Sequence, residues 1–131
     1  MPRMELGFPG PLRDQLVAAV LSGAKTTTTG LRIGYDVDGE PLPVAGERRV
    51  VVDSADSPVA VIEIVGVRVL RLADVDLRHA VDEGEGDESV AQWRAGHERF
   101  WHSPEVLAEL PGGFRVDDDT MVVALRFDRV W

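Results

Sequence analysis

The chain has 131 residues, the size of a single domain, and its 44% hydrophobic and 28% charged residues are ordinary for a folded globular protein. This composition excludes a disordered or fibrous chain. With 23 acidic and 14 basic residues the formal net charge is −9, which disfavours a protein that binds long stretches of nucleic acid through a net positive field. The absence of cysteine excludes disulfides, thiolate zinc sites and cysteine nucleophiles.

Neither a membrane span nor a targeting segment is expected. No run of the sequence approaches the ~20 apolar residues that a spanning helix needs, and the N-terminus lacks the long apolar stretch of a signal peptide. We therefore expect a cytoplasmic protein with no membrane partner. All but one of the 14 basic residues are arginines, so Lys25 is the only side-chain amine that can act as a neutral base.

The first half of the chain predicts one helix followed by strands. Apolar residues recur at helical spacing over residues 11–22. Residues 25–31 contain four consecutive threonines, and β-branched residues favour an extended strand. Residues 34–46 contain glycine turns and prolines, which indicates a loop, and 48–52 form the next strand.

The second half predicts a long strand, several helices and a closing strand. Residues 58–72 are the longest β-like run, and Gly66 in its middle predicts the bulge or bend with which a small barrel turns a corner. The other predicted elements are a helical turn over 77–81, an acidic loop over 82–88, a helix capped by Asp87 or Ser89, a short helix starting at Ser103 and Pro104, and a strand over 121–130. Strands and helices do not alternate, so the sequence predicts one α+β domain: a small, mostly antiparallel β-barrel with helices packed around it.

Lys25 and the threonines after it are the first candidate site. An amine beside hydroxyls can supply a base and a nucleophile, whereas an exposed face of threonines with a solvated lysine is the plainer interpretation. Residues 25 and 28 of a regular strand point to opposite faces. Lys25 therefore reaches Thr28 only from a loop before the strand, or across a bulge.

The acidic loop over residues 82–88 holds five carboxylates in seven residues. Hard cations take oxygen ligands, but this loop lacks the alternate spacing and the distal glutamate of an EF-hand. A solvated loop that caps the next helix is the commoner arrangement of such residues. A further alternative is that one carboxylate folds back against Lys25.

The helix after this loop has an aromatic stripe formed by Trp93, His97, Phe100 and Trp101. A stripe of this kind either stacks on a nucleobase or forms the core face of an amphipathic helix. The sequence contains no zinc-protease motif, no nucleophile elbow and no phosphate-binding glycine loop.

Several segments, in this order, resemble the ASCH domain family, named for its homology to activating signal cointegrator. The Gly-x-Lys-Thr-x-Thr junction at residues 23–28 is similar to the entry signature of the family. The features similar to its longer bacterial branch are the stretch 83–89, Leu31, Tyr35, Trp93, His97 and Phe100. The resemblance covers residues 8–131 as a single domain, and it implies a PUA-like β-barrel and an association with RNA.

One short bacterial branch of this family hydrolyses N4-acetylcytidine to cytidine and acetate, using a lysine, a threonine three positions later and a glutamate four positions after a histidine. The resemblance therefore implies that Thr28 attacks the acyl carbon and Lys25 accepts its proton. Glu83, four residues after His79, would orient Lys25 or protonate the leaving amine. Gly30 stands where this branch commonly has an arginine, and Arg32 can take its place.

Around this centre the resemblance leads us to expect substrate-binding residues and no metal or other cofactor. The residues expected to bind substrate are Thr26, Arg32, Glu85, Trp93 and His97.

Two other functions remain open. Other ASCH proteins are linked to ribonuclease activity, for which Lys25 and Tyr35 are the candidate catalytic residues. The arginines available to contact phosphates would be Arg32, Arg48, Arg49, Arg68, Arg71 and Arg78. A non-catalytic PUA-like module would bind a nucleotide or RNA without turnover. The expected partner is thus a small nucleoside or RNA.

Overall fold

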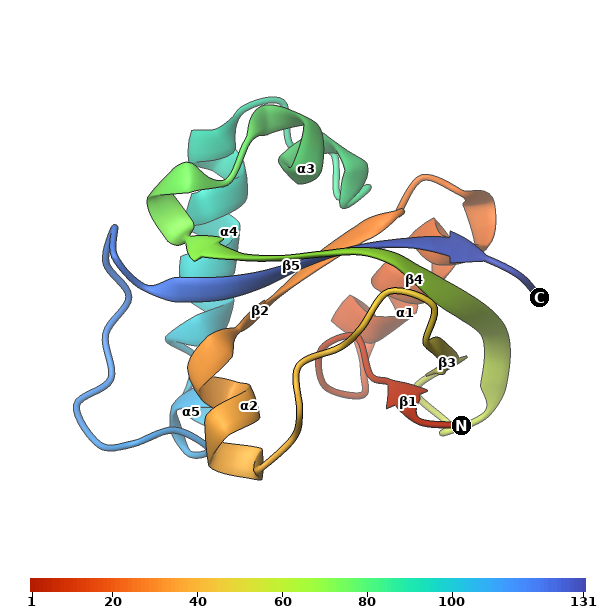
Figure 1. Ribbon diagram of the computed structural model, residues 1–131, viewed down its shortest axis with the longest axis horizontal. Helices are drawn as coiled ribbons and strands as arrows, with labels where there is room; N and C mark the ends of the chain where they lie inside the picture. Colours follow the sequence, from red (N-terminus) through yellow and green to blue (C-terminus); the bar gives the residue numbers. More distant parts are fainter.

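The computed structural model describes residues 1–131 and consists of one sheet with helices around it (Figure 1). The elements, in chain order, are β1 (Arg3–Met4), α1 (Pro11–Ser22), β2 (Thr27–Leu31), α2 (Arg32–Asp38), β3 (Arg48–Val52), β4 (Pro58–Arg71), the 3₁₀ helix η1 (Leu72–Asp74), α3 (Leu77–Asp82), α4 (Val90–Trp101), α5 (Pro104–Leu107) and β5 (Met121–Arg129). None of the helices has the length and apolar composition that a membrane crossing requires.

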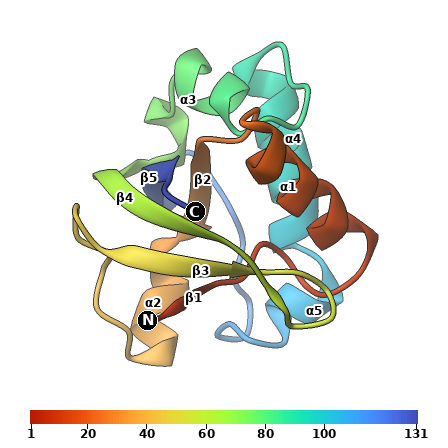
Figure 2. The ribbon, with the colours of Figure 1, turned by 90° about the vertical axis from the view of Figure 1, so that its right-hand side faces the viewer.

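The five strands form one mixed sheet in the order β1-β3-β4-β5-β2. β1 pairs with β3 in parallel, and the other three pairs are antiparallel. β1 and β2 are the two edges and do not pair with each other, so the curved sheet stays open (Figure 2). The expected barrel is therefore not formed, because the two edge strands do not pair to close the sheet.

Local signals predicted most of the elements correctly. Residues 11–22 form a helix, and the β4–β5 register shifts between Ile64 and Gly66, which confirms the bulge. Ser89 rather than Asp87 caps α4, because its side chain accepts a hydrogen bond from the Gln92 N–H.

Three elements were not predicted: α2, β1 and the 3₁₀ helix η1. The region 34–46 was expected to be a loop, but α2 begins directly after β2 and runs to Asp38, with Gly39 ending it at φ +66°. This short helix has no fully buried residue; Tyr35 packs it against the core, a tertiary contact that no local pattern reveals. β1 is too short to show any periodicity.

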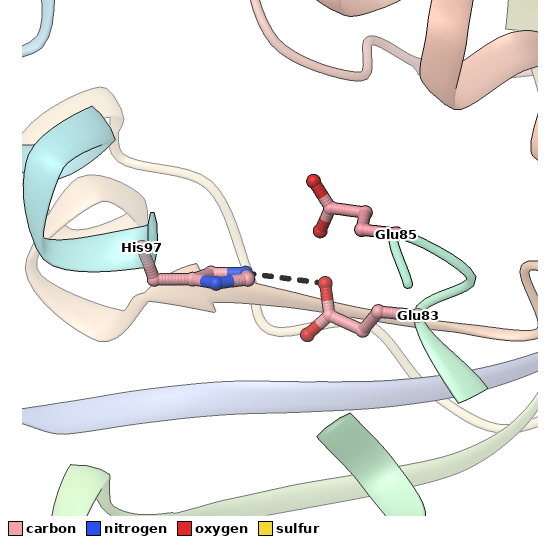
Figure 3. A group of neighbouring side chains, drawn as sticks. All are labelled: Glu83, Glu85 and His97. Atoms are coloured by element: carbon pink, nitrogen blue, oxygen red, sulfur yellow. Dashed lines mark hydrogen bonds and ion pairs between the residues drawn. The ribbon is translucent and has the colours of Figure 1, made fainter. Parts of the chain in front are cut away.

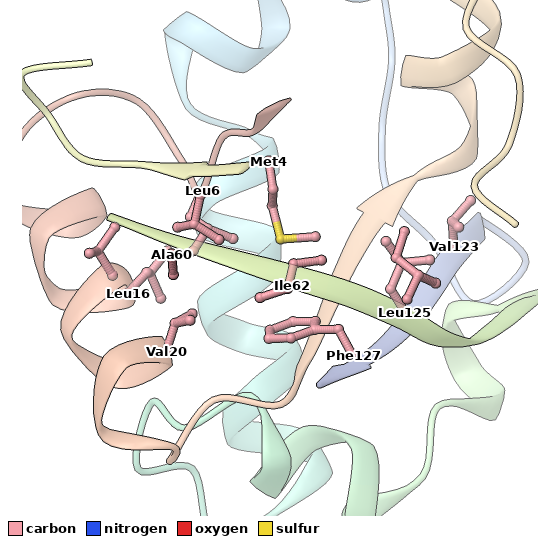
Figure 4. Packing of buried hydrophobic residues seen from close by; sticks show 12 residues of the cluster. Met4, Leu6, Leu16, Val20, Ala60, Ile62, Val123, Leu125 and Phe127 are labelled. Carbon is pink, nitrogen blue, oxygen red and sulfur yellow. The ribbon is translucent and has the colours of Figure 1, made fainter. Parts of the chain in front are cut away.

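β5 contributes to two hydrophobic clusters: the alternate residues Val123, Leu125 and Phe127 belong to one, and Val122, on the opposite face of the strand, belongs to the other. The larger cluster packs α1 against the sheet and includes Leu16, Val20, Ile62, Leu125 and Phe127 (Figure 4). The smaller one packs α3 and α4 and includes Leu72, Ala80, Trp93, Trp101 and Val122. β2 lies at an edge of the sheet, and in the view of Figure 1 it crosses the space between α4 and α1.

Candidate active site

Lys25 lies in the loop between α1 and β2, which is the position from which it can approach the β2 edge. Its side chain is only 2% exposed. Nζ donates to the Thr27 carbonyl at 2.8 Å, and to the carbonyl and the Oε1 atom of Glu83 at 3.4 Å each. Three acceptors match the three N–H bonds of an ammonium group, so Lys25 is held as a cation with every donor in use.

The Glu83 carboxylate, 1% exposed, follows α3 and is the centre of the site. Its Oε1 atom accepts from Lys25 and from His97 Nε2 at 3.1 Å. Its Oε2 atom accepts from Trp93 Nε1 at 2.7 Å and from the Thr29 hydroxyl at 2.8 Å. Burial acts to raise the pKa of Glu83, but the hydrogen bonds and the neighbouring cations outweigh it and hold the pKa well below its usual value.

Thr29 and His79 complete this network, and the sequence analysis assigned a role to neither. The Thr29 hydroxyl donates to Glu83, so it accepts from His79 Nε2 at 2.7 Å. The Thr27 hydroxyl donates to the His79 carbonyl at 2.8 Å. Thr27 and Thr29 share one face of β2, and His79 precedes Glu83 by four residues, so the local spacing groups each pair but does not reveal the contact between the two pairs.

His97 of α4 is held between two acceptors. Its Nδ1 atom contacts the Trp93 carbonyl at 2.9 Å and its Nε2 atom contacts Glu83, so both ring nitrogens act as N–H donors. Burial acts to lower the pKa of His97, but the hydrogen bond and charge of Glu83 outweigh it and the pKa is raised. The imidazolium stacks on the Trp93 indole with ring centroids 4.3 Å apart.

A glycine brings the acidic loop against the Lys25 loop. Gly84 has φ +74°, and a Cβ atom there would lie 2.7 Å from the backbone of Ala24. The Thr26 N–H also donates to the Asp82 carbonyl at 2.8 Å. This close approach is what joins Lys25 to Glu83, 58 residues later in the chain.

Glu85 differs from Glu83 although only one residue separates them. One oxygen of each carboxylate and a His97 ring nitrogen lie within 4.8 Å of one another (Figure 3). Glu85 has no hydrogen-bond partner in the protein, and burial raises its pKa against the opposing charges of Lys25 and His97. Because Glu83 and His97 are bonded to each other, Glu85 alone offers an unused ligand atom, and the three residues do not form a ready cation site.

A pocket of about 950 Å³ opens beside the free edge of β2. Its lining includes Lys25, Thr28, Thr29, Tyr35, Glu83, Glu85 and His97, with Phe8, Leu16 and Phe100 among its apolar residues. Acidic side chains outnumber basic ones in the lining by eight to five. The acidic residues are Glu5, Asp38, Glu40, Asp56, Glu83, Glu85, Asp87 and Glu109, and the basic ones are Arg13, Lys25, Arg49, His97 and Arg99.

Comparison with known proteins identifies the family of this chain. The model of the ASCH domain matches residues 5–131. The chain belongs to the ASCH domain family. Among solved structures it is similar to protein EF3133 from Enterococcus faecalis V583, with a TM-score of 0.86 and 27% identity over 99% of this chain and 76% of that chain. No curated protein matches the sequence.

Two further ASCH structures are similar to this chain. The ASCH domain from Lactobacillus crispatus JV V101 has a TM-score of 0.76 and 30% identity over 89% of this chain and 71% of that chain. A tyrosine-to-phenylalanine mutant of ZmASCH from Zymomonas mobilis has a TM-score of 0.52 and 17% identity over 88% of this chain and 64% of that chain. At this identity the similarity is evidence of a shared fold only.

In this ASCH domain the predicted site residues fall into three groups. Lys25, Glu83 and His97 are joined directly, with Glu85 beside them. Thr28 and Tyr35 line the same pocket, but neither side chain is bonded to Lys25. Burial raises the pKa of the Tyr35 phenol, whose ring lies over Gly30, so it is protonated at neutral pH.

The other predicted residues lie outside the pocket lining. Trp93 is fully buried and acts on Glu83, so its predicted contact with substrate has no support from the geometry. Thr26 is engaged through its backbone by Asp82 and Phe127, and Arg32 is exposed at the start of α2. Neither is placed to contact a ligand in this pocket.

The predicted arginine patch is largely neutralised. Five of its six members form ion pairs with acidic residues, at 2.8 to 3.8 Å. These pairs are Arg48–Glu63, Arg49–Glu47, Arg68–Asp76, Arg71 with Asp74 and Asp119, and Arg78–Asp82. Only Arg49 of the six lines the pocket.

Proposed function

We propose that this ASCH domain hydrolyses the amide bond of an acylated nucleoside, with N4-acetylcytidine as the most concrete substrate. The observation that carries the proposal is that three groups suited to acyl transfer line one pocket. Thr28, whose hydroxyl has no hydrogen-bond partner in the protein, lines the same pocket as the buried Lys25 ammonium and the Glu85 carboxylate. These are the groups that acyl transfer requires: a nucleophile, a fixed positive charge and a proton carrier.

The size and charge of the pocket support a small uncharged ligand. About 950 Å³ is within the range of small-molecule sites. The acidic excess of the lining opposes phosphates, whereas a nucleoside carries none. Phe8 and Phe100, with ring centroids 5.9 Å apart, supply an apolar wall for a flat base.

In the proposed reaction the Thr28 oxygen attacks the acyl carbon, and the amine leaves as the C–N bond breaks. The acyl group is then an ester of Thr28, which water hydrolyses to release the acid. Lys25 has all three N–H bonds donated to acceptors, so it stabilises the oxyanion by its charge. That arrangement differs from the proton acceptor that the resemblance implied.

The test is turnover of N4-acetylcytidine, followed by chromatography of cytidine. We expect Thr28→Ala to lower the rate at least 10³-fold and Thr28→Ser to retain activity. Thr26→Ala is the matched control, since Thr26 belongs to the same threonine run but does not line the pocket, and it should leave the rate unchanged. Full activity of Thr28→Ala would refute the nucleophile, and an inactive wild-type protein would refute this substrate.

Cleavage of single-stranded RNA is the second candidate, favoured by one observation: Lys25, Tyr35 and Arg49 line the same pocket. It predicts cleavage that weakens steeply with salt and is lost in Tyr35→Phe. Binding of nucleotide or RNA without turnover would instead indicate a non-catalytic module.

A further inference from the structure

We propose that Glu85 is the general base and acid of the site: it takes the proton from the Thr28 hydroxyl and delivers it to the departing amine. This inference rests on the proposed hydrolase function and assigns the proton transfer to one carboxylate.

Glu83, His97 and Lys25 have no free position for this proton. Both oxygens of Glu83 together accept four hydrogen bonds, and the carboxylate is 1% exposed. His97 donates through both ring nitrogens and so has no lone pair to offer. Lys25 donates to three acceptors. An ion held by every available hydrogen bond is suited to orienting a site, and less to exchanging protons within it.

Glu85 has the opposite properties. Its carboxylate lines the pocket without a partner in the protein. The cationic groups that face it are Lys25 and His97, and the anionic ones are Glu83 and Asp87. Burial raises its pKa, which brings the carboxylate closer to the operating pH of a general base than an exposed glutamate.

Two glycines shape the backbone on either side of Glu85. Gly84 and Gly86 have φ values of +74° and +86°, a left-handed conformation that favours glycine. Gly84 also packs directly on the Ala24 backbone, next to Lys25. Glu85 is therefore anchored to the segment that leads into Thr28.

In each half of the reaction Glu85 takes up one proton and releases it again. The Glu85 carboxylate accepts the Thr28 proton as the oxygen–carbon bond forms, and the protonated carboxyl gives that proton to the amine nitrogen as the C–N bond breaks. In the second half Glu85 accepts a proton from water, whose oxygen attacks the ester. It then returns the proton to the Thr28 oxygen as the acid leaves.

The experiment compares Glu85→Gln with Glu88→Gln, which removes the same charge from an exposed position of the same loop outside the pocket lining. We expect Glu85→Gln to lower kcat about 10²- to 10⁴-fold and Glu88→Gln to leave it unchanged. In wild type, kcat/KM should fall as the pH drops through the raised pKa of Glu85, and Glu85→Gln should lack this acid limb. Formate should restore part of the activity of Glu85→Ala.

Two results overturn the proposal. If Glu85→Gln keeps wild-type kcat and its acid limb while Thr28→Ala is inactive, the hydrolase stands and Glu85 is not its proton carrier. If wild type does not turn over N4-acetylcytidine, the proposed substrate is wrong. The pKa of the Glu85 carboxyl is then measured independently of activity, by a carbon-13 NMR titration of the glutamate carboxyls. A resonance with a raised pKa that is missing from Glu85→Gln supports an exchangeable proton there. If Glu85 titrates like an exposed glutamate, the proposal is refuted.

Discussion

Gly84 is the residue on which the assembly of the site depends, and Gly84→Ala tests this with Gly86→Ala as its control. Both glycines have positive φ, +74° and +86°, so a side chain at either position costs about 1–2 kcal/mol of backbone strain. At Gly86 an added Cβ meets nothing within 4 Å, and strain is the whole effect. At Gly84 the Cβ would lie 2.7 Å from the Ala24 carbonyl and 2.8 Å from the Lys25 nitrogen, so one of the two loops must move.

The difference between the two variants measures the contact. Overpacking of this kind costs about 1–3 kcal/mol beyond the strain, so Gly84→Ala should lose about 2–5 kcal/mol and Gly86→Ala about 1–2 kcal/mol. Urea unfolding monitored by tryptophan fluorescence gives both values, since buried Trp93 reports on the site. Equal losses would show that the Ala24 contact does not constrain the loop, and the argument that Gly84 joins Lys25 to Glu83 would fail.

Three further outcomes follow from the same network. Lys25→Met removes one of the two cations paired with the buried Glu83 carboxylate and should cost about 3–5 kcal/mol in urea unfolding. The double variant with Glu83→Gln should recover part of this loss. Thr29→Val leaves His79 and Glu83 each short of a hydrogen bond and should cost about 2–4 kcal/mol, whereas Thr28→Val should cost under about 1 kcal/mol, both read from chemical denaturation midpoints. The pKa of Glu83 is lower in the folded protein than its unfolded value near 4.5, so its ionisation stabilises the fold above that pH, and this stability is lost as the pH falls through the folded pKa. The pKa of His97 is raised in the folded protein, so its protonation stabilises the fold fully below pH 6.5, and this stability is lost as the pH rises through the folded pKa. Thermal melts across pH should therefore peak between these limits, and His97→Asn should flatten the alkaline side.

The parts of the fold that could be predicted are those with local causes. The helix over 11–22 and the bulge at Gly66 follow from apolar spacing and from one glycine in a strand. Whether the sheet closes depends on the lengths and the pairing of β1 and β2, which are set by contacts far apart in the sequence. The pattern of strands in the sequence therefore could not predict whether the sheet closes into a barrel.

The candidate site was predictable to the extent that the family resemblance placed its residues. Lys25 was singled out as the only lysine, Glu83 was named from that resemblance, and the structure brings them together. The roles around them were not predictable, because they depend on burial. Trp93 was expected to face a ligand and instead donates to Glu83 from the core, while Thr29 was missed beside Thr28 although its hydroxyl is the one that Glu83 accepts from.

The two glutamates at positions 83 and 85 show how one short loop supplies two different carboxylates. Donors and cations lower the pKa of Glu83, and burial raises that of Glu85; groups whose pKa values are driven apart in this way are suited to separate roles. With Lys25 and His97 as cations and both glutamates ionised, the four side chains carry no net charge. When Glu85 takes the nucleophile's proton, the cluster becomes positive in the same step in which the attacked carbonyl oxygen becomes negative. The proton transfer would thus generate, beside the reacting group, the charge that stabilises its oxyanion.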